Sequence, residues 1–258
     1  QSVGLDPNSS DEYYWLGAVY GEFAKKNRSN IFKGPSYASN SHKYLQLSID
    51  VNPKNIEAYR GLFWFYIGAP TIVGGGIDKA EKLLANIRAI SPLDADILQL
   101  KLYQQKGEKD KQLAQAQFLM VTYPNSVEAL HAAALEFFSQ KKLEPAIAAF
   151  DAVSKLPKTT QNASLVESSI LYFAGTCAWA GVRIDEAITR AENFLASKAD
   201  DKKFDKNVGY WTLAKLYHIK GNMEKYHSLR NSLDPDFIKR TQWMRDDIDG
   251  FDKLDKKS

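Results

Sequence analysis

Apolar residues return at helical spacing along most of the chain. After Ala80, Ala146 and Ala187, apolar side chains recur every three or four residues. This period is that of an amphipathic α-helix with one buried face, and helices are expected to end near prolines because proline cannot continue a helix. The pattern predicts an all-α protein whose helices are separated near Pro53, Pro92, Pro124, Pro157 and Pro235.

A short signature repeats at the start of several predicted helices: a turn residue, an aliphatic residue, an acid, any residue and an alanine. It reads Gly-Ile-Asp-Lys-Ala at 76–80, Lys-Leu-Glu-Pro-Ala at 142–146 and Arg-Ile-Asp-Glu-Ala at 183–187. The acid can cap the first N–H groups of a helix and oppose its dipole, and the small alanine lets two helices approach closely. Alanines 80, 114, 146 and 187 are 34, 32 and 41 residues apart, and the longest interval contains an inserted stretch at 159–163.

The stretch before each signature helix is a second amphipathic segment. In the last unit it runs from Tyr210 through Trp211, Leu213 and Ala214 to Tyr217, and Gly221 follows as a helix stop. This order of residues, together with a period near 34, resembles the tetratricopeptide repeat family. The resemblance implies a right-handed α-solenoid of about six helix pairs and a C-terminal capping helix. The expected pairs are 11–53, 54–92, 93–124, 125–158, 162–200 and 205–235, with the cap at 236–249.

The expected organisation is an N-terminal extension at 1–10, the solenoid at 11–249 and a frayed tail at 250–258. Two pairs depart from the repeat. About a dozen extra residues, 27–39, are expected to separate the helices of the first pair, and Leu113-Ala114 replaces the signature in the third. Stacked pairs share a core that a single helical hairpin cannot build alone, so the array needs a polar-faced cap.

Composition narrows the classes of function. The 34 basic and 31 acidic residues give a formal charge of +3, which is too balanced to indicate nucleic acid as a partner. A single cysteine, Cys177, excludes an intramolecular disulfide and a cysteine zinc site, and it lies among small residues where a buried core thiol is expected. No apolar run reaches the ~18 residues of a membrane span, so no transmembrane segment is expected.

The sequence offers no catalytic pattern. The four histidines, His42, His131, His218 and His227, are dispersed, and no metalloprotease, nucleophile-elbow or phosphate-loop motif is present. We therefore expect a protein that is not an enzyme and that uses no metal or cofactor.

Aromatic residues make up 12% of the chain and point to a binding surface. In tetratricopeptide arrays the first helix of each pair lines the concave groove. We aligned each predicted first helix by the small residue at position eight of the repeat, and this alignment gives the positions that point into the groove. A groove of rings suits an apolar or amphipathic segment of a partner protein, since aromatic side chains bury a large area at low entropic cost. The predicted binding residues are Tyr14, Phe65, Tyr66, Tyr103, His131, Phe138, Tyr172, Trp179, Trp211, Lys215 and His218.

One well-known use of the fold is not expected. Tetratricopeptide modules that hold acidic chaperone tails carry a clamp of Lys and Asn at two groove positions of their first helices. Here those positions hold Tyr14 and Ala18, Ala58 and Leu62, and Gln99 and Tyr103.

The turn inside the second pair is longer than the repeat requires. It contains Pro70, Ile72 and Val73, which we expect to pack over the adjacent helices, and then Gly74, Gly75 and Gly76. Consecutive glycines before a helix N-terminus could instead hold an anion or another small ligand. The turn also resembles those of exported bacterial tetratricopeptide proteins, such as the accessory component of tripartite periplasmic transporters, although that component's lipid-bearing cysteine is missing here.

Three functions follow from this reading. We prefer a scaffold or adaptor that binds a protein or peptide partner in the groove. The alternatives are a structural subunit that associates with itself or with an envelope or extracellular assembly, and an accessory solute- or lipid-binding component of a transport system. The chain begins at Gln1, so we expect a bacterial periplasmic or secreted protein whose signal peptide has been removed, with a cytoplasmic location as the alternative.

Overall fold

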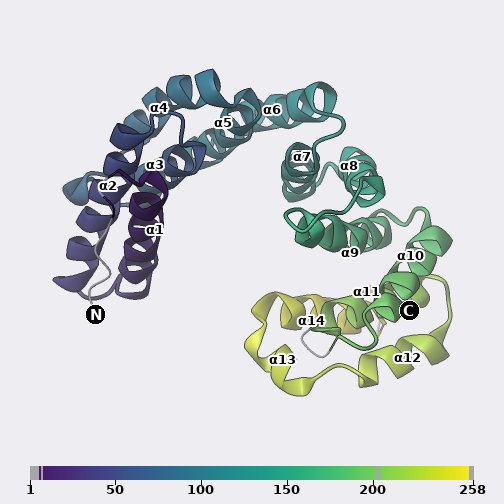
Figure 1. The fold of residues 1–258 in the computed structure, drawn as a ribbon. Helices are drawn as coiled ribbons and strands as arrows, with labels where there is room; N and C mark the ends of the chain where they lie inside the picture. Colours follow the sequence, from purple (N-terminus) through teal and green to yellow (C-terminus); the bar gives the residue numbers. More distant parts are fainter. Residues whose placement is uncertain (1–5, 7, 202–203, 256–258) are drawn as a thin grey trace. The chain divides into compact units, whose positions relative to one another are not determined.

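The fold is built entirely from helices in the part of the chain that the structure describes. The computed structural model describes Asp6 and residues 8–201 and 204–255. Over these residues it contains fourteen α-helices and one short 3-10 helix, which confirms the predicted all-α class (Figure 1). The chain divides into two compact units, residues 1–121 and 122–258.

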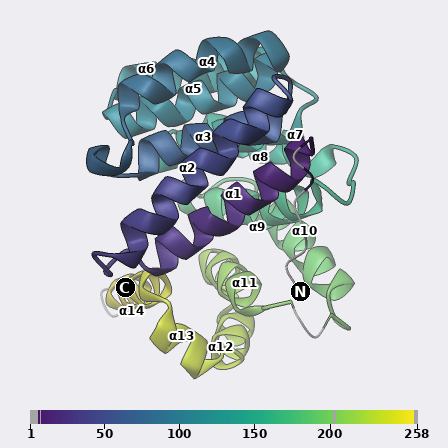
Figure 2. The same cartoon turned by 60° about the vertical axis from the view of Figure 1, so that its left-hand side comes forward.

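The first unit contains the first three helix pairs. Its pairs are α1 (Ser10–Lys26) with α2 (Lys33–Val51), α3 (Ile56–Gly68) with α4 (Ile77–Ile90), and α5 (Pro92–Lys106) with α6 (Lys109–Thr122). The 3-10 helix η1 (Thr71–Val73) lies in the turn between α3 and α4. The helices α1 and α2 run side by side in both views of the ribbon, and α1 also contacts α3, the first helix of the next pair (Figures 1 and 2).

The second unit contains the other three pairs and the cap. Its pairs are α7 (Val127–Ser139) with α8 (Leu143–Lys155), α9 (Ala163–Ala180) with α10 (Ile184–Ser197), and α11 (Asn207–Ile219) with α12 (Met223–Asn231). The cap is formed by α13 (Pro235–Arg240) and α14 (Gln242–Asp255). As in the first unit, the first helices of successive pairs contact one another, α7 with α9 and α9 with α11.

The local sequence explains where these helices begin. Side-chain oxygens of Ser9, Asn55, Ser91 and Ser126 accept backbone N–H groups in the first turns of α1, α3, α5 and α7. The signature acids lie in the first turns of α4, α8 and α10, where the helix dipole favours a negative charge. The repeat signature therefore marks helix starts, as predicted.

Small residues set the distance between paired helices. Ala80, Ala146 and Ala187 of the signature are completely buried. A Cβ added at Gly17 would lie 2.8 Å from Leu45 Cγ and 3.0 Å from its backbone nitrogen, and a Cβ at Gly61 would lie 2.8 Å from Leu45 Cδ2, so both glycines let their helices pack closely on Leu45 of α2. Leu45 belongs to a core cluster in the first unit that extends from α2 to α5.

Cys177 is completely buried in α9, as the sequence predicts. Burial raises the pKa of its thiol to about 11. A rise from the reference value of about 9 lowers the thiolate fraction at neutral pH about a hundredfold. We expect Cys177 to resist iodoacetamide in the folded protein and to react fully in denaturant, as followed by mass spectrometry. Rapid labelling of folded protein would show that α9 opens locally.

Three boundaries differ from the sequence prediction. The helix α2 begins at Lys33 and not after residue 39, because Asn30 Oδ1 accepts the N–H groups of Phe32 and Lys33 and because a proline is tolerated in a first turn, where Pro35 lies. The cap is two helices that meet near Thr241. The helix α14 continues to Asp255, so the predicted tail from residue 250 is largely helical. Residues 256–258 and most of the predicted extension 1–10 lie outside the described residues.

Candidate partner-binding surface

Three of the predicted binding residues form one exposed group in the second unit. Phe138 of α7 lies next to Tyr172 and Trp179 of α9, with ring centroids 6.4 and 6.1 Å apart. Tyr172 and Trp179 are seven residues apart and therefore lie on one face of α9. Their exposed fractions are 40% and 56%. We call Phe138, Tyr172 and Trp179 the α7–α9 ring cluster.

Buried groups hold this cluster in place. The ring of Tyr172 stacks on Phe150 of α8, with centroids 5.0 Å apart and planes within 8°. His131, which the sequence placed in the groove, is buried beneath Tyr172, and its Nδ1 lies 2.9 Å from Ser169 Oγ. A ring fixed on a packed base loses little side-chain entropy when a partner covers its outer face.

Three other predicted residues are covered by the cap. Trp211 Nε1 donates to Asp247 Oδ2 at 2.8 Å, and Lys215 Nζ donates to the same oxygen at 2.6 Å. The ring of Phe251 lies 5.7 Å from Trp211 and 5.2 Å from His218. Trp211 and Lys215 are buried, so they join α11 to α14 in this structure and present no open surface.

The predicted groove residues of the first unit are only partly accessible. Tyr14, Phe65 and Tyr66 are partly buried and pack against the core cluster of that unit. The rings of Phe65 and Tyr66 lie 5.1 and 5.8 Å from the ring of His42 on α2. Burial raises the pKa of Tyr14 and Tyr66 and lowers that of His42. Tyr103 is half-buried, with Lys111 Nζ 5.6 Å from its ring centroid.

Two exposed tryptophans of the first unit are absent from the predicted binding residues. Trp15 is 64% exposed and Trp64 is 49% exposed, and each is the chain neighbour of a predicted residue, Tyr14 or Phe65. One residue corresponds to a rotation of about 100° around a helix, so the chain neighbour of a half-buried residue can face solvent. The spacing of Trp15, Val19 and Phe23 gives no signal of their exposure, because apolar residues four apart are the usual pattern of a buried helix face.

In the glycine turn of the first unit, the glycine N–H groups already donate hydrogen bonds to nearby backbone carbonyls. Those of Gly74, Gly75 and Gly76 donate to the carbonyls of Thr71, Pro70 and Tyr66 at 3.0, 3.2 and 2.8 Å. Donors that are already bonded offer nothing to an anion, so the geometry supports a structural turn. The expected packing of the turn's apolar residues is wrong for Pro70 and Ile72, which are exposed, Ile72 by 93%.

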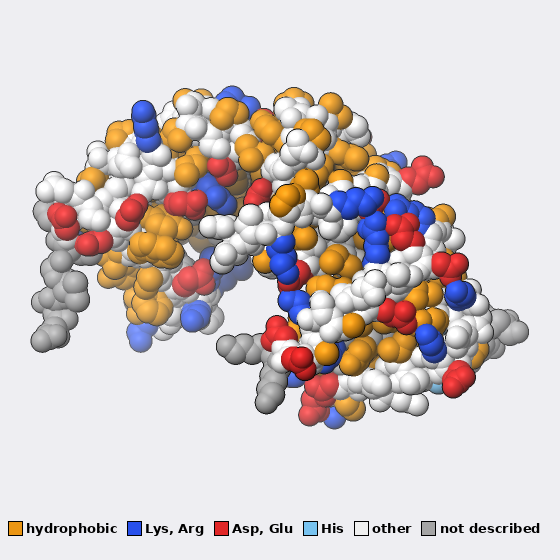
Figure 3. All heavy atoms as spheres, turned by 45° about the vertical axis from the view of Figure 1, so that its right-hand side comes forward, with side chains coloured by type: hydrophobic (Ala, Val, Ile, Leu, Met, Phe, Trp, Pro, Cys, Tyr) orange, Lys and Arg blue, Asp and Glu red, His pale blue; other side chains and the backbone are white. Residues whose placement is uncertain are grey.

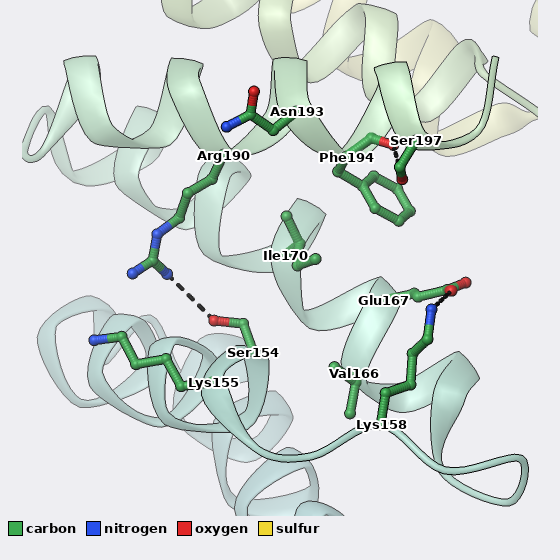
Figure 4. Close-up of a pocket in the computed structure, with 10 residues that line it drawn as sticks. All are labelled: Ser154, Lys155, Lys158, Val166, Glu167, Ile170, Arg190, Asn193, Phe194 and Ser197. Atoms are coloured by element: carbon green, nitrogen blue, oxygen red, sulfur yellow. Dashed lines mark hydrogen bonds and ion pairs between the residues drawn. The ribbon is translucent and has the colours of Figure 1, made fainter.

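A hollow of about 480 Å³ lies between α8, α9 and α10 of the second unit (Figure 4). Its apolar floor is formed by Val166, Ile170 and Phe194, and its rim includes Lys158 and Arg190. The inserted stretch 159–163 precedes α9 here and lengthens the link from α8.

The charges around this hollow are already paired with one another. Glu167 accepts hydrogen bonds from Lys158 and Lys198 at 2.6 and 2.9 Å. Burial acts to raise the pKa of Glu167, but these two hydrogen bonds outweigh it and lower the pKa below its usual value. Arg190 pairs with Asp151 at 2.8 Å. A rim of paired charges provides no selective ion site, so the ring cluster is the stronger candidate for binding.

Among the described residues, no group of three or more His, Cys, Asp or Glu side chains is placed to hold a metal ion. None of the described helices has the length and the apolar character that crossing a membrane requires.

Comparison with known proteins shows similarity at the level of structure. No family model matches the sequence, and no curated protein matches it. The solved structure of pilF from Pseudomonas aeruginosa is 13% identical and covers 85% of this chain and 88% of its own, with a TM-score of 0.54. A tetratricopeptide repeat protein from Parabacteroides merdae is 16% identical and covers 84% and 81%, with a TM-score of 0.47.

The fold is tetratricopeptide-like. Its helices pack sequentially in pairs, as the repeat signature of the sequence predicts, and the solved structure of pilF is similar over most of the chain. Identities this low show the fold alone. A fold does not assign a function by itself, but stacked helix pairs present an extended surface that a partner can contact.

Proposed function

We propose that this protein is a non-enzymatic scaffold that holds an apolar segment of a partner protein against the α7–α9 ring cluster. The observation that carries the proposal is the exposure of Tyr172 and Trp179 beside Phe138 on two adjacent first helices. Exposed tryptophan and tyrosine rings are the residues that most often dominate binding energy at protein interfaces.

The packing beneath the cluster favours this role. Tyr172 rests on Phe150 and on buried His131, so the cluster does not have to order itself when it binds. The matching chemistry is a segment that carries one or two aliphatic or aromatic side chains, since the three rings present apolar faces and edges.

Substitution of the exposed rings tests the proposal. Peptides selected from a random displayed library on the wild-type protein are expected to bind Trp179→Ala and Tyr172→Ala at least about tenfold more weakly, the size of a typical aromatic hot spot. Binding would be measured by fluorescence anisotropy on labelled peptides.

Trp243→Ala is the matched control, because Trp243 is 52% exposed but lies on α14 outside the cluster. It should leave affinity unchanged. Selected peptides that bind all three variants like the wild type would exclude the ring cluster as the binding surface. Trp211 is unsuitable for this test, since its loss would disturb the cap.

A further inference from the structure

The outer face of α1 in the first unit is an uncovered apolar stripe. Trp15, Val19 and Phe23 are 64%, 47% and 44% exposed and lie four residues apart, which places them on one side of the helix. Figure 3 shows hydrophobic side chains gathered at the lower left, over the first helix pair. Surface apolar residues that occur singly need no explanation, but a continuous stripe marks an interaction site.

Charged residues continue this stripe at both ends. Glu12 lies three residues before Trp15, and Lys26 lies three residues after Phe23. Both are exposed. The Glu12 carboxylate accepts the N–H of Asp6 at 2.9 Å, and the side chain of Lys26, whose charge helps to lower the pKa of Glu22, forms no hydrogen bond or close ion pair among the described residues. At 100° per residue all five positions fall within a narrow sector of α1.

The order of residues along the stripe is symmetric about its centre. The spacings from Glu12 through Trp15, Val19 and Phe23 to Lys26 are three, four, four and three residues. Reading it from the other end gives the same spacings with the charge reversed, and the apolar positions remain apolar. A surface with this property is complementary to an antiparallel copy of itself, as a two-fold interface requires.

We propose that two copies of this chain associate through α1, packed antiparallel about a two-fold axis at Val19. In this arrangement Val19 meets its own counterpart and Trp15 of each copy meets Phe23 of the other. Glu12 of each copy then faces Lys26 of the other, so two ion pairs close the ends of the apolar seam. The charge complementarity of the stripe with itself is what selects a second copy as the occupant.

Neighbouring rings extend the surface available to the second copy. Phe23 lies 5.5 Å from Tyr37 on α2, and Tyr20 stacks on Tyr44 with centroids 5.5 Å apart and planes within 4°. The half-buried rings of Tyr20, Tyr37 and Tyr44 hold α1 on α2, so the stripe is presented on a rigid helix pair.

The mass in solution tests the association directly. Light scattering over a range of concentrations is expected to give about twice the chain mass of 29.1 kDa at high concentration. Val19→Glu places two like charges on the axis and should raise the dissociation constant about a hundredfold, with unchanged helical circular dichroism. A wild-type protein that stays monomeric throughout, or a dimer that Val19→Glu does not weaken, would overturn the proposal.

Charge reversal separates this geometry from other modes of association. Glu12→Lys and Lys26→Glu each set like charges against one another at both ends of the seam, so each variant alone should dimerise about tenfold more weakly. Mixed in equal amounts they should form a heterodimer, because every facing pair is then opposite in charge. The double variant should also regain association. If the mixture dimerises as weakly as each single variant does alone, antiparallel pairing is refuted.

Cross-linking locates the two-fold axis. Val19→Cys should form a disulfide-linked dimer on mild oxidation, because the native Cys177 is buried and cannot compete. Val51→Cys is the matched control, since Val51 has a similar exposed fraction, 39%, at the end of α2. Cross-linking at both positions alike would contradict the proposed axis. This surface is distinct from the α7–α9 ring cluster, so either proposal can fail while the other stands.

Discussion

Replacing Asp247 by alanine is expected to lower the free energy of unfolding of the second unit by about 3–5 kcal/mol, the usual cost of removing one partner of a buried ion pair. Asp247 accepts hydrogen bonds from Trp211 and Lys215, and the side chain of Lys215 is only 8% exposed. The variant leaves the ammonium of Lys215 in a site without its counter-charge. We expect α14 to separate from α11, which hydrogen exchange of the α14 amides would detect.

Two further variants show whether the charge itself is responsible. Replacing both partners, as Lys215→Met with Asp247→Leu, removes the buried charge and should recover most of the lost stability. Asp246→Ala is the matched control, because Asp246 is an exposed neighbour that accepts a hydrogen bond from Gln242, and it should change stability by less than about 0.5 kcal/mol. If Asp246→Ala lowers the free energy of unfolding as much as Asp247→Ala does, then α14 is sensitive to any substitution and the ion pair is not the cause.

The pairing of helices could be predicted from sequence because each device that produces it is local. The signature acids sit in first turns, where their effect depends only on the adjacent N–H groups. The alanines at positions 80, 146 and 187 are completely buried, so a larger side chain there would push the packed helices apart. A repeat multiplies such signals, so even the third pair, where the signature is missing, could be predicted from the spacing of its neighbours.

The candidate site was harder to predict because it depends on rotation about each helix axis. In the first unit the predicted residues Tyr14 and Phe65 are half-buried, whereas their chain neighbours Trp15 and Trp64 are exposed. In α9 the same method found Tyr172 and Trp179, which are exposed. Repeat spacing fixes the length of a helix well, but the exposure of each side chain also depends on which neighbouring side chains pack over it.

The covering of α11 by the cap was difficult to predict for a different reason, because it depends on contacts between residues far apart in the sequence. Trp211, Lys215 and His218 occupy groove positions by spacing, and nothing near them in the chain shows that Asp247 and Phe251 will cover them. The polar face of α14 was recognised, but not the single carboxylate that it directs to α11. A terminal helix can therefore remove the last repeat from a binding surface without any sign in that repeat's own sequence.

Replacing Gly75 by alanine is expected to destabilise the first unit by about 3 kcal/mol, near the upper end for overpacking of a well-packed site. A Cβ at this position would lie 1.8 Å from the carbonyl oxygen of Ala69 and 2.6 Å from its carbonyl carbon. Both atoms belong to the backbone at the end of α3, so they cannot yield as a flexible side chain would. The turn would have to open, which breaks the 2.8 Å hydrogen bond from Gly76 to Tyr66.

Gly68→Ala is the matched control for the same turn. It adds the same methyl group seven residues earlier, at the last position of α3, where nothing lies within 4 Å of the added Cβ. We expect this variant to be neutral or more stable by about 0.5 kcal/mol, because alanine has less freedom than glycine in the unfolded chain. The stability of both variants is measured by urea unfolding followed by circular dichroism, and hydrogen exchange of the α3 and α4 amides shows whether the turn opens. If Gly75→Ala matches Gly68→Ala, the close contact with Ala69 does not constrain the turn, and its three glycines would need another explanation.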